Sequence, residues 1–249
     1  MAILGNSHDV DMNPHQGLRP GPRSGPGRTS YRIPTTVAGV AALTGFTPDN
    51  LWGFQDTAAP IVDAASGQNL SQIAANTYAD ATPFAGHKQM TPGVSPAGYV
   101  SGGIGGFGTG SWMFVYGTYV LDDLNQGALY GLATSGMYTR HNYISGHAFY
   151  AKEEGTLDHT LTILGKQPGY VVKAVGIDKS TNLMFQAVRG MGITNISTYS
   201  ITGWGAVAGG GGIQTSDGAA RNEPMLFLWL FKGDNGYAAA AERIVDSIF

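Results

Sequence analysis

A chain of 249 residues can bury the core of one large domain or two small ones without disulfides or metals. Charged residues make up 12% of it, about half of the usual share of roughly 25%, which indicates an unusually neutral surface suited to contact with other protein. The lack of cysteine excludes disulfides, thiol nucleophiles and cysteine-based zinc sites.

The N-terminus has no basic segment before its short apolar run, so no signal peptide is expected. No apolar stretch reaches the roughly 20 residues of a membrane-spanning helix, so no membrane partner is expected. The chain is therefore predicted to be made in the cytoplasm and to remain there unless a larger assembly carries it out.

The first segment is rich in proline and glycine and is basic. Between Pro14 and Pro34 it carries four arginines and no acid: Arg19, Arg23, Arg28 and Arg32. Because the whole chain carries −3 and this segment +4, the remainder carries −7. Proline and glycine at this density favour neither helix nor sheet, so residues 1–45 are predicted to form an extended arm outside a body of residues 46–249.

The end of this arm, YRIPTTVAGVAAL at residues 31–43, is apolar enough to dock on the body. Pro34 and Gly39 are expected to prevent a regular element there. Three interpretations of the arm stay open. In the first, the four arginines and Tyr31 dock on an acidic protein surface. In the second, the arginines contact phosphates of a nucleic acid, and in the third, the segment is a tail without function. Protein docking is favoured, because the body is acidic and no aromatic residues alternate with the arginines.

The body is predicted to consist of short strands separated by turns. Aromatic and β-branched residues recur without a helical period, which favours an antiparallel sandwich or jelly roll. Asp63–Leu70 is predicted to be a turn, since Asp, Ser, Gly and Asn bond locally to the backbone or accept positive φ. The predicted strands are Leu51–Phe54, Gly110–Leu121, Ala128–Leu132, Tyr138–Ile144, His147–Ala151, Asp158–Leu164, Gly169–Asp178, Asn182–Val188, Ile193–Ile201 and Pro224–Phe231.

Only the C-terminal segment is predicted to be helical. Its apolar residues fall at i, i+3, i+4, i+7, i+8 and i+11, which is one face of a helix packed on the sandwich. Asp234 or Asn235 is expected to cap its N-terminus. The residues of the stripe are Tyr237, Ala240, Ala241, Ile244, Val245 and Ile248.

The order of these segments resembles laminin-G-like and concanavalin-A-like jelly-roll domains. The similar stretches are PIVDAASGQNLS after an aromatic strand, the strand GSWMFVYGTYVL, the hairpin YVVKAVGIDKSTNLMFQAV and the closing PMLFLWLFKGDNGYAAAAERIVDSI. The calcium turn common in such domains is not evident, and the arm has no counterpart in them. Such domains are frequent in virion proteins of tailed bacteriophages, where an arm attaches a lectin-like body to the particle.

The resemblance therefore implies a virion structural protein, either a capsid decoration or cement protein or a head-fibre protein. Its partners would be the major capsid protein or another virion protein and further copies of the chain, with a trimer as one candidate. The alternative is a carbohydrate-binding, lectin-like module that binds a receptor or forms part of a tail fibre. Nucleic acid is disfavoured as a partner because the body is acidic.

Catalysis is not expected. Glycosidases of this fold place carboxylates at alternate positions of one strand, whereas the four glutamates here are Glu153, Glu154, Glu223 and Glu242. The adjacent Glu153 and Glu154 would take opposite faces of a strand. No nucleophile motif is present, and neither a cofactor nor a metal is expected.

Two further motifs are interpreted as structural. The glycine pattern of residues 103–108 precedes a strand, whereas a phosphate-binding loop precedes a helix. The histidines, at positions 8, 15, 87, 141, 147 and 159, lack metal-ligand spacing, although His141 and His147 lie in neighbouring predicted strands.

Trp204, in a glycine-rich stretch, is the candidate contact for a glycan or a partner, or else closes one end of the sandwich. Trp112 and Trp229 lie in dense apolar runs and are predicted to be core residues.

Overall fold

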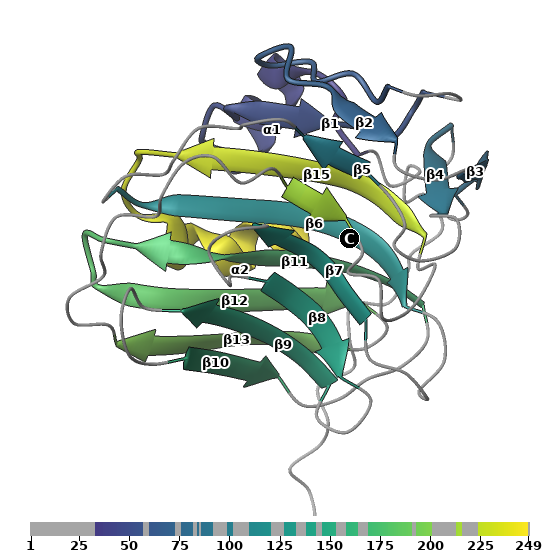
Figure 1. Cartoon of the computed structure of the whole chain (residues 1–249). Helices are drawn as coiled ribbons and strands as arrows, with labels where there is room; N and C mark the ends of the chain where they lie inside the picture. Colours follow the sequence, from purple (N-terminus) through teal and green to yellow (C-terminus); the bar gives the residue numbers. More distant parts are fainter. Residues whose placement is uncertain are drawn as a thin grey trace, which may run out of the picture.

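In a computed structural model of this chain, the described residues form two antiparallel β-sheets and two helices (Figure 1). The structure describes residues 33–56, 60–72, 76–81, 84, 86–91, 99–101, 110–120, 127–132, 138–142, 146–152, 158–163, 169–190, 193–200, 213–215 and 224–248. The predicted all-β sandwich with a C-terminal helix is confirmed. The arm that was predicted for residues 1–45 lies mostly outside the described residues.

Sheet 1 contains the long buried strands. Its order in the described part of the chain is β13-β12-β11-β6-β15-β4-β3, and β1 pairs with β15. Its strands are β1 (Asn50–Trp52), β3 (Thr77–Asp80), β4 (Lys88–Thr91), β6 (Trp112–Val120), β11 (Gly169–Asp178), β12 (Leu183–Gly190), β13 (Ile193–Ser200) and β15 (Met225–Lys232).

Sheet 2 lies against sheet 1 and has the order β10-β9-β8-β7-β14-β5-β2 among the described strands. Its strands are β2 (Leu70–Gln72), β5 (Tyr99–Ser101), β7 (Gly127–Leu132), β8 (Tyr138–Asn142), β9 (Gly146–Lys152), β10 (Asp158–Ile163) and β14 (Ile213–Thr215). Every predicted strand segment overlaps a strand of one of the two sheets. The short strands β2, β3, β4, β5 and β14 were not predicted.

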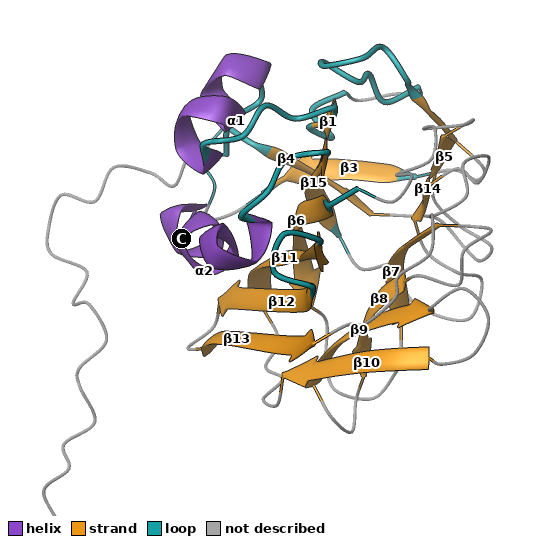
Figure 2. Cartoon of the chain, turned by 90° about the vertical axis from the view of Figure 1, so that its left-hand side faces the viewer, coloured by secondary structure: helices purple, strands orange, loops and turns teal. Residues whose placement is uncertain are grey.

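The molecule has three layers, shown edge-on in Figure 2: the helices, sheet 1 and sheet 2. Alternate residues of the sheet 1 strands face in opposite directions. On β6, Trp112, Phe114 and Tyr116 lie in the cluster shared with sheet 2, whereas Met113 and Val115 lie in the cluster shared with the helices. Sheet 1 is therefore buried on both faces, as its continuous apolar strands require.

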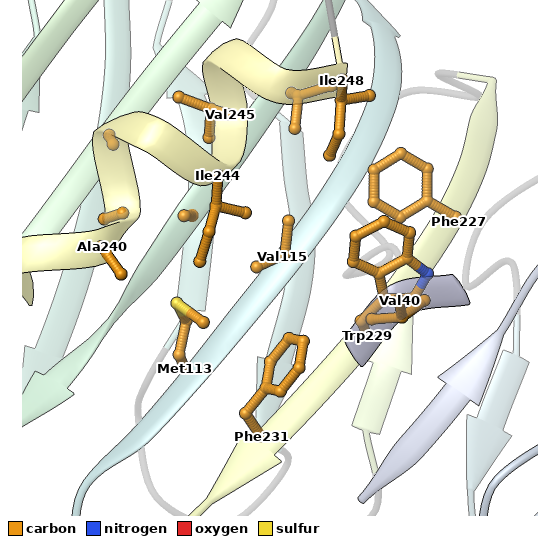
Figure 3. Close-up of a cluster of buried hydrophobic side chains, with 14 of the residues drawn as sticks. Val40, Met113, Val115, Phe227, Trp229, Phe231, Ala240, Ile244, Val245 and Ile248 are labelled. Carbon is orange, nitrogen blue, oxygen red and sulfur yellow. The ribbon is translucent and has the colours of Figure 1, made fainter. Parts of the chain in front are cut away.

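Helix α2 (Tyr237–Ile248) covers sheet 1 through the predicted apolar stripe. All six residues of the stripe are buried, and the helix packs on β6, β11, β12 and β13. Figure 3 shows Ala240, Ile244, Val245 and Ile248 over the side chains of sheet 1. Neither described helix is long and apolar enough to cross a membrane.

A second helix, α1 (Val37–Thr44), occupies the segment that was predicted to be irregular, so this prediction was wrong. Pro34 precedes the helix, and Thr36 caps it by accepting a hydrogen bond from Gly39 N at 3.1 Å. Val40 is fully buried in the cluster with α2 (Figure 3). Arg243 of α2 donates to the main-chain oxygens of Leu43 and Thr44, at 3.3 and 2.7 Å, and so closes the other end of α1.

The predicted cap of α2 was also wrong. Asp234 N donates to the hydroxyl of Tyr237, and Gly236, with φ of 85°, precedes the helix. The acceptor at the N-terminus of α2 is instead the buried carboxylate of Asp178, at the end of β11, which accepts from Ala238 N at 3.1 Å. The helix is thus capped by a residue 60 positions earlier in the chain.

Candidate functional site

The outward face of sheet 2 is the candidate site, because both described helices lie on the far side of sheet 1 (Figure 2). Two residues near opposite edges of sheet 2 fix which face is inward. Leu70 of β2 and Leu161 of β10 are both buried in the cluster between the sheets. Ser71, the neighbour of Leu70, is exposed. Since successive residues of a strand alternate between faces, Ser71 marks the outward face.

The β2 edge of this face is held by a hydrogen-bonded turn around Asp63, which is 3% exposed. Its Oδ1 accepts from Leu51 N and Ala65 N, at 2.8 and 2.9 Å. Its Oδ2 accepts from Asn50 Nδ2 and Ser66 Oγ at 2.7 and 2.5 Å, and from Gln68 N at 3.2 Å. The predicted turn over Asp63–Leu70 is confirmed, and it ties β1 of sheet 1 to the start of β2.

These contacts also set the charge of the turn. Burial raises the pKa of Asp63, but the hydrogen bonds from Leu51 N, Ser66 Oγ and Ala65 N outweigh it, so the net pKa lies below its ordinary value. Asp63 is therefore a carboxylate near neutral pH, with its oxygens already used by the protein. We assign it a structural role.

The β10 edge is held by packing and by one polar link. Leu161, 4% exposed, lies in the cluster with Trp112 and Tyr116 of sheet 1. Gln186 of β12 donates from Nε2 to the main-chain oxygen of Leu161 at 3.3 Å. Sheet 1 therefore positions both edges of sheet 2.

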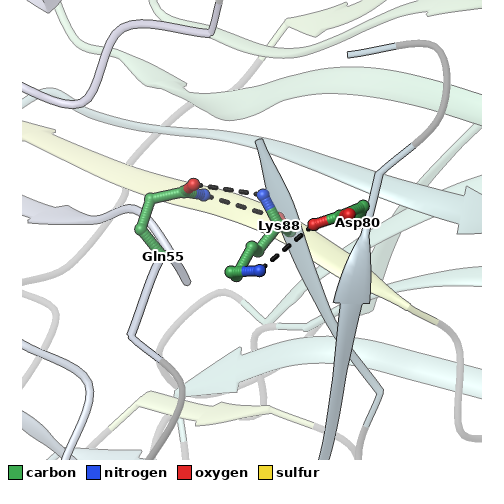
Figure 4. Close-up of polar contacts among 3 residues, drawn as sticks. All are labelled: Gln55, Asp80 and Lys88. Atoms are coloured by element: carbon green, nitrogen blue, oxygen red, sulfur yellow. Dashed lines mark hydrogen bonds and ion pairs between the residues drawn. The ribbon is translucent and has the colours of Figure 1, made fainter. Parts of the chain in front are cut away.

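The hairpin of β3 and β4 carries exposed polar groups, but they serve the hairpin itself. Gln55 bonds both main-chain groups of Lys88: its Oε1 accepts from Lys88 N at 3.1 Å and its Nε2 donates to Lys88 O at 3.4 Å (Figure 4). Lys88 Nζ pairs with Asp80 at 3.1 Å (Figure 4). Because the Asp80 side chain is 86% exposed, this pair adds little stability.

An aromatic cluster lies near the end of β6, on the helix-covered face of sheet 1. Tyr170 packs edge-to-face with Tyr119 and with Phe84, with centroid distances of 4.8 and 5.3 Å, and its hydroxyl donates to Gln89 Oε1 at 2.8 Å. These contacts engage the ring and the hydroxyl of Tyr170 in joining β11 to β4. The cluster is thus accounted for by packing.

The histidines show no metal geometry in the part of the chain that the structure describes, where no group of three His, Cys, Asp or Glu side chains converges. His87 is buried and donates from Nε2 to Leu226 O at 2.9 Å. Burial lowers the pKa of His87. His141 and His147 are register partners on β8 and β9, which confirms that they lie in neighbouring strands.

All residues that the sequence singled out for binding lie outside the described residues. These are the arm residues Arg19, Arg23, Arg28, Arg32 and Tyr31, together with Trp204. Their roles stay predictions. The glycine pattern at 103–108 and Glu153, Glu154 and Glu223 lie outside as well, and Glu242 is exposed on α2. Trp112 and Trp229 are buried, which confirms them as core residues.

Sequence reasoning missed the outward face of sheet 2 as a site. Its strands β7, β8, β9 and β10 were predicted, but which residues share a face depends on how strands far apart in the chain pair. The sequence signal was the two-residue alternation of side chains within the predicted strands Asp158–Leu164 and His147–Ala151. This alternation does not show which of the two sets of residues faces the core.

Comparison with known proteins identifies the fold. No protein-family profile matches this chain, and no curated protein matches it. Among solved structures, the binding domain of botulinum neurotoxin DC in complex with SialylT has a TM-score of 0.57, is 12% identical, and is matched over 80% of this chain and 51% of that one. Botulinum neurotoxin type C, for which interaction with two ganglioside molecules is described, has the same TM-score and identity, with 80% and 50% covered.

A third match is the binding domain of botulinum neurotoxin DC in complex with rat synaptotagmin II, with a TM-score of 0.55, 10% identity, and 80% and 51% covered. At such identity these likenesses show a shared fold alone, an all-β sandwich of the jelly-roll type. This chain spans about half the length of those chains. Two of these three similar structures are described as binding domains.

Proposed function

We propose that this chain is a carbohydrate-binding module and that the outward face of sheet 2 binds the glycan. The observation that carries the proposal is the layer order: the described helices cover sheet 1, and the face of sheet 2 that is marked by Ser71 has no described helix over it. A broad, gently twisted sheet surface offers room for a ligand larger than a cofactor.

The comparisons support this choice over the virion role. One similar structure is of botulinum neurotoxin type C, for which interaction with two ganglioside molecules is described, and another is of a botulinum neurotoxin binding domain in complex with SialylT. The neutral composition also fits, since 12% charged residues leave a chain rich in hydroxyl and amide groups. Such groups bind sugars through hydrogen bonds without a large cost of desolvating charge.

The test is a glycan array probed with the full chain, followed by calorimetry on each glycan that is captured. We expect saturable binding to at least one glycan. A chain that is folded by circular dichroism yet binds no neutral or acidic glycan contradicts the proposal. Trp204 remains a predicted contact, and loss of a glycan-dependent fluorescence change in Trp204→Ala would assign it.

The proposal assigns binding without catalysis, as the positions of the glutamates predict. Incubating the chain with each bound glycan and assaying new reducing ends tests this part. We expect the glycan to be recovered intact, and release of shorter products would contradict it.

Attachment to a phage particle through the basic arm is a second candidate function. It rests on the four arginines without an acid between Pro14 and Pro34, opposite in sign to the rest of the chain. This candidate function includes a location in the virion. Its partners would be the major capsid protein, another virion protein or further copies of the chain. Deleting residues 1–32 should abolish occupancy on the particle, and unchanged occupancy would contradict the role of the arm. The deletion stops before Ile33 because that residue is buried in the core.

A further inference from the structure

One row of register partners crosses all seven described strands of sheet 2. Ser71 pairs with Val100, Val100 with Gln214, and Gln214 with Gly131. The row continues through Tyr138, Tyr150 and Thr160, since Gly131 pairs with Tyr138, Tyr138 with Tyr150, and Tyr150 with Thr160. At the spacing of neighbouring strands, this row is about 29 Å long.

The row lies on the outward face, and both edges of the sheet agree on this. At the β2 edge, Ser71 is exposed. At the β10 edge, Leu161 is buried between the sheets, and Thr160 is its neighbour on the strand. Residues opposite one another share a face, so the row holds the outward positions from edge to edge.

The composition of the row is neutral and includes two adjacent aromatics. None of its seven positions is Asp, Glu, Lys or Arg. Tyr138 and Tyr150 are direct register partners, and Gly131 stands beside Tyr138. Charged residues occur on the same face to either side: Arg140 two positions from Tyr138, and the opposed pair Lys152 and Asp158.

From this placement we infer that the row is the binding surface for an extended, uncharged oligosaccharide, with the Tyr138–Tyr150 pair as its aromatic platform. The inference rests on the proposed function and names its site and ligand class. Aromatic rings offer apolar faces to the C–H faces of sugars, while the serine, threonine, glutamine and tyrosine of the row can hydrogen-bond to hydroxyls. A row without ionic groups discriminates against an anionic chain, because it supplies no countercharge.

The test is calorimetry of the full chain with four neutral hexasaccharides, cellohexaose, xylohexaose, laminarihexaose and mannohexaose, and with sialyllactose and a heparin hexasaccharide as acidic probes. We expect one neutral hexasaccharide to bind. The double variant Tyr138→Ala, Tyr150→Ala should weaken its binding by about tenfold or more. The matched control, Tyr138→Phe with Tyr150→Phe, keeps both rings and should stay within about threefold.

A second variant keeps the test valid if the alanine pair fails to fold. Ser71→Arg adds a long cation at an exposed position of the row, so the fold should tolerate it while binding of the neutral hexasaccharide weakens. If both the folded alanine pair and Ser71→Arg keep the hexasaccharide affinity, the row is not the binding surface, and the proposed function still stands. Binding of the acidic probes alone overturns the neutral ligand class. Binding of no probe at all overturns both.

Discussion

At the scale of single residues, Asp63 shows why a buried carboxylate resists even a conservative change. Each of its oxygens accepts hydrogen bonds from main-chain N–H groups, and Oδ2 accepts from Asn50 and Ser66 as well. An asparagine in its place would turn an NH₂ group toward donors, whichever way its amide is oriented.

We therefore predict that Asp63→Asn lowers the free energy of unfolding by about 2–3 kcal/mol. Urea denaturation followed by tryptophan fluorescence measures it. Asp80→Asn is the control, because Asp80 is exposed and its ion pair with Lys88 lies on the surface. The control should cost less than about 1 kcal/mol, and equal losses in the two variants would contradict the structural role of Asp63.

The same residue predicts a pH dependence. Burial raises the pKa of Asp63, but its hydrogen bonds lower the pKa by more, so the net pKa lies below the ordinary value of an aspartate. A depressed carboxyl pKa contributes stability that is complete above the unfolded pKa of about 3.9 and is lost as pH falls through the folded pKa. The stability difference between the wild type and Asp63→Asn should thus shrink below about pH 4 in urea titrations. A stability difference that widens below about pH 4 would contradict a lowered pKa for Asp63.

At the scale of elements, α2 depends on a residue outside its own segment. Asp178 lies in the β11–β12 hairpin, where Oδ1 accepts from Ser180 N and Ser180 Oγ, and Oδ2 accepts from Ala238 N in the first turn of α2. A carboxylate at this position also interacts favourably with the helix dipole.

Asp178→Ala should destabilise the protein by about 1–3 kcal/mol, since it removes the cap and leaves the buried Ala238 N without this acceptor. Asp234→Ala tests the cap that the sequence predicted, and it should change stability by less than about 0.5 kcal/mol. Thermal unfolding of the two variants compares them directly. A larger loss in Asp234→Ala would restore the sequence-based assignment.

The long elements of this fold could be predicted from sequence, and the reason is their burial. β6, β11 and β15 are apolar at almost every position because both faces of sheet 1 are covered, and α2 repeats its apolar residues at helical spacing. β2, β5 and β14 have three residues each, too few for a periodic pattern to emerge. The cap from Asp178 and the row on sheet 2 arise from pairing between distant segments, which no local window contains.

At the scale of the whole molecule, the described end of the predicted arm belongs to the core. Ile33 and Val40 are buried in the cluster with α2, and Arg243 bonds the end of α1. The predicted boundary between residues 45 and 46 remains untested, and two truncations can test it.

Deleting residues 1–45 should lower the melting temperature by about 4 °C or more relative to deleting residues 1–32, because only the longer deletion removes these buried contacts. Differential scanning calorimetry of both truncated chains measures the shift. Equal melting temperatures would show that α1 is dispensable and would support the boundary as predicted from sequence.

The layer order also determines how copies of this chain could act together. α1, the first described element, lies in the helical layer, while β8 and β9, the strands that carry Tyr138 and Tyr150, lie on the opposite side of the sandwich (Figure 2). A scaffold that holds several copies by their N-terminal segments would therefore leave every sheet 2 free to reach one polymeric ligand. Modest affinity per copy would then add up to high avidity, governed by the spacing of copies on the scaffold.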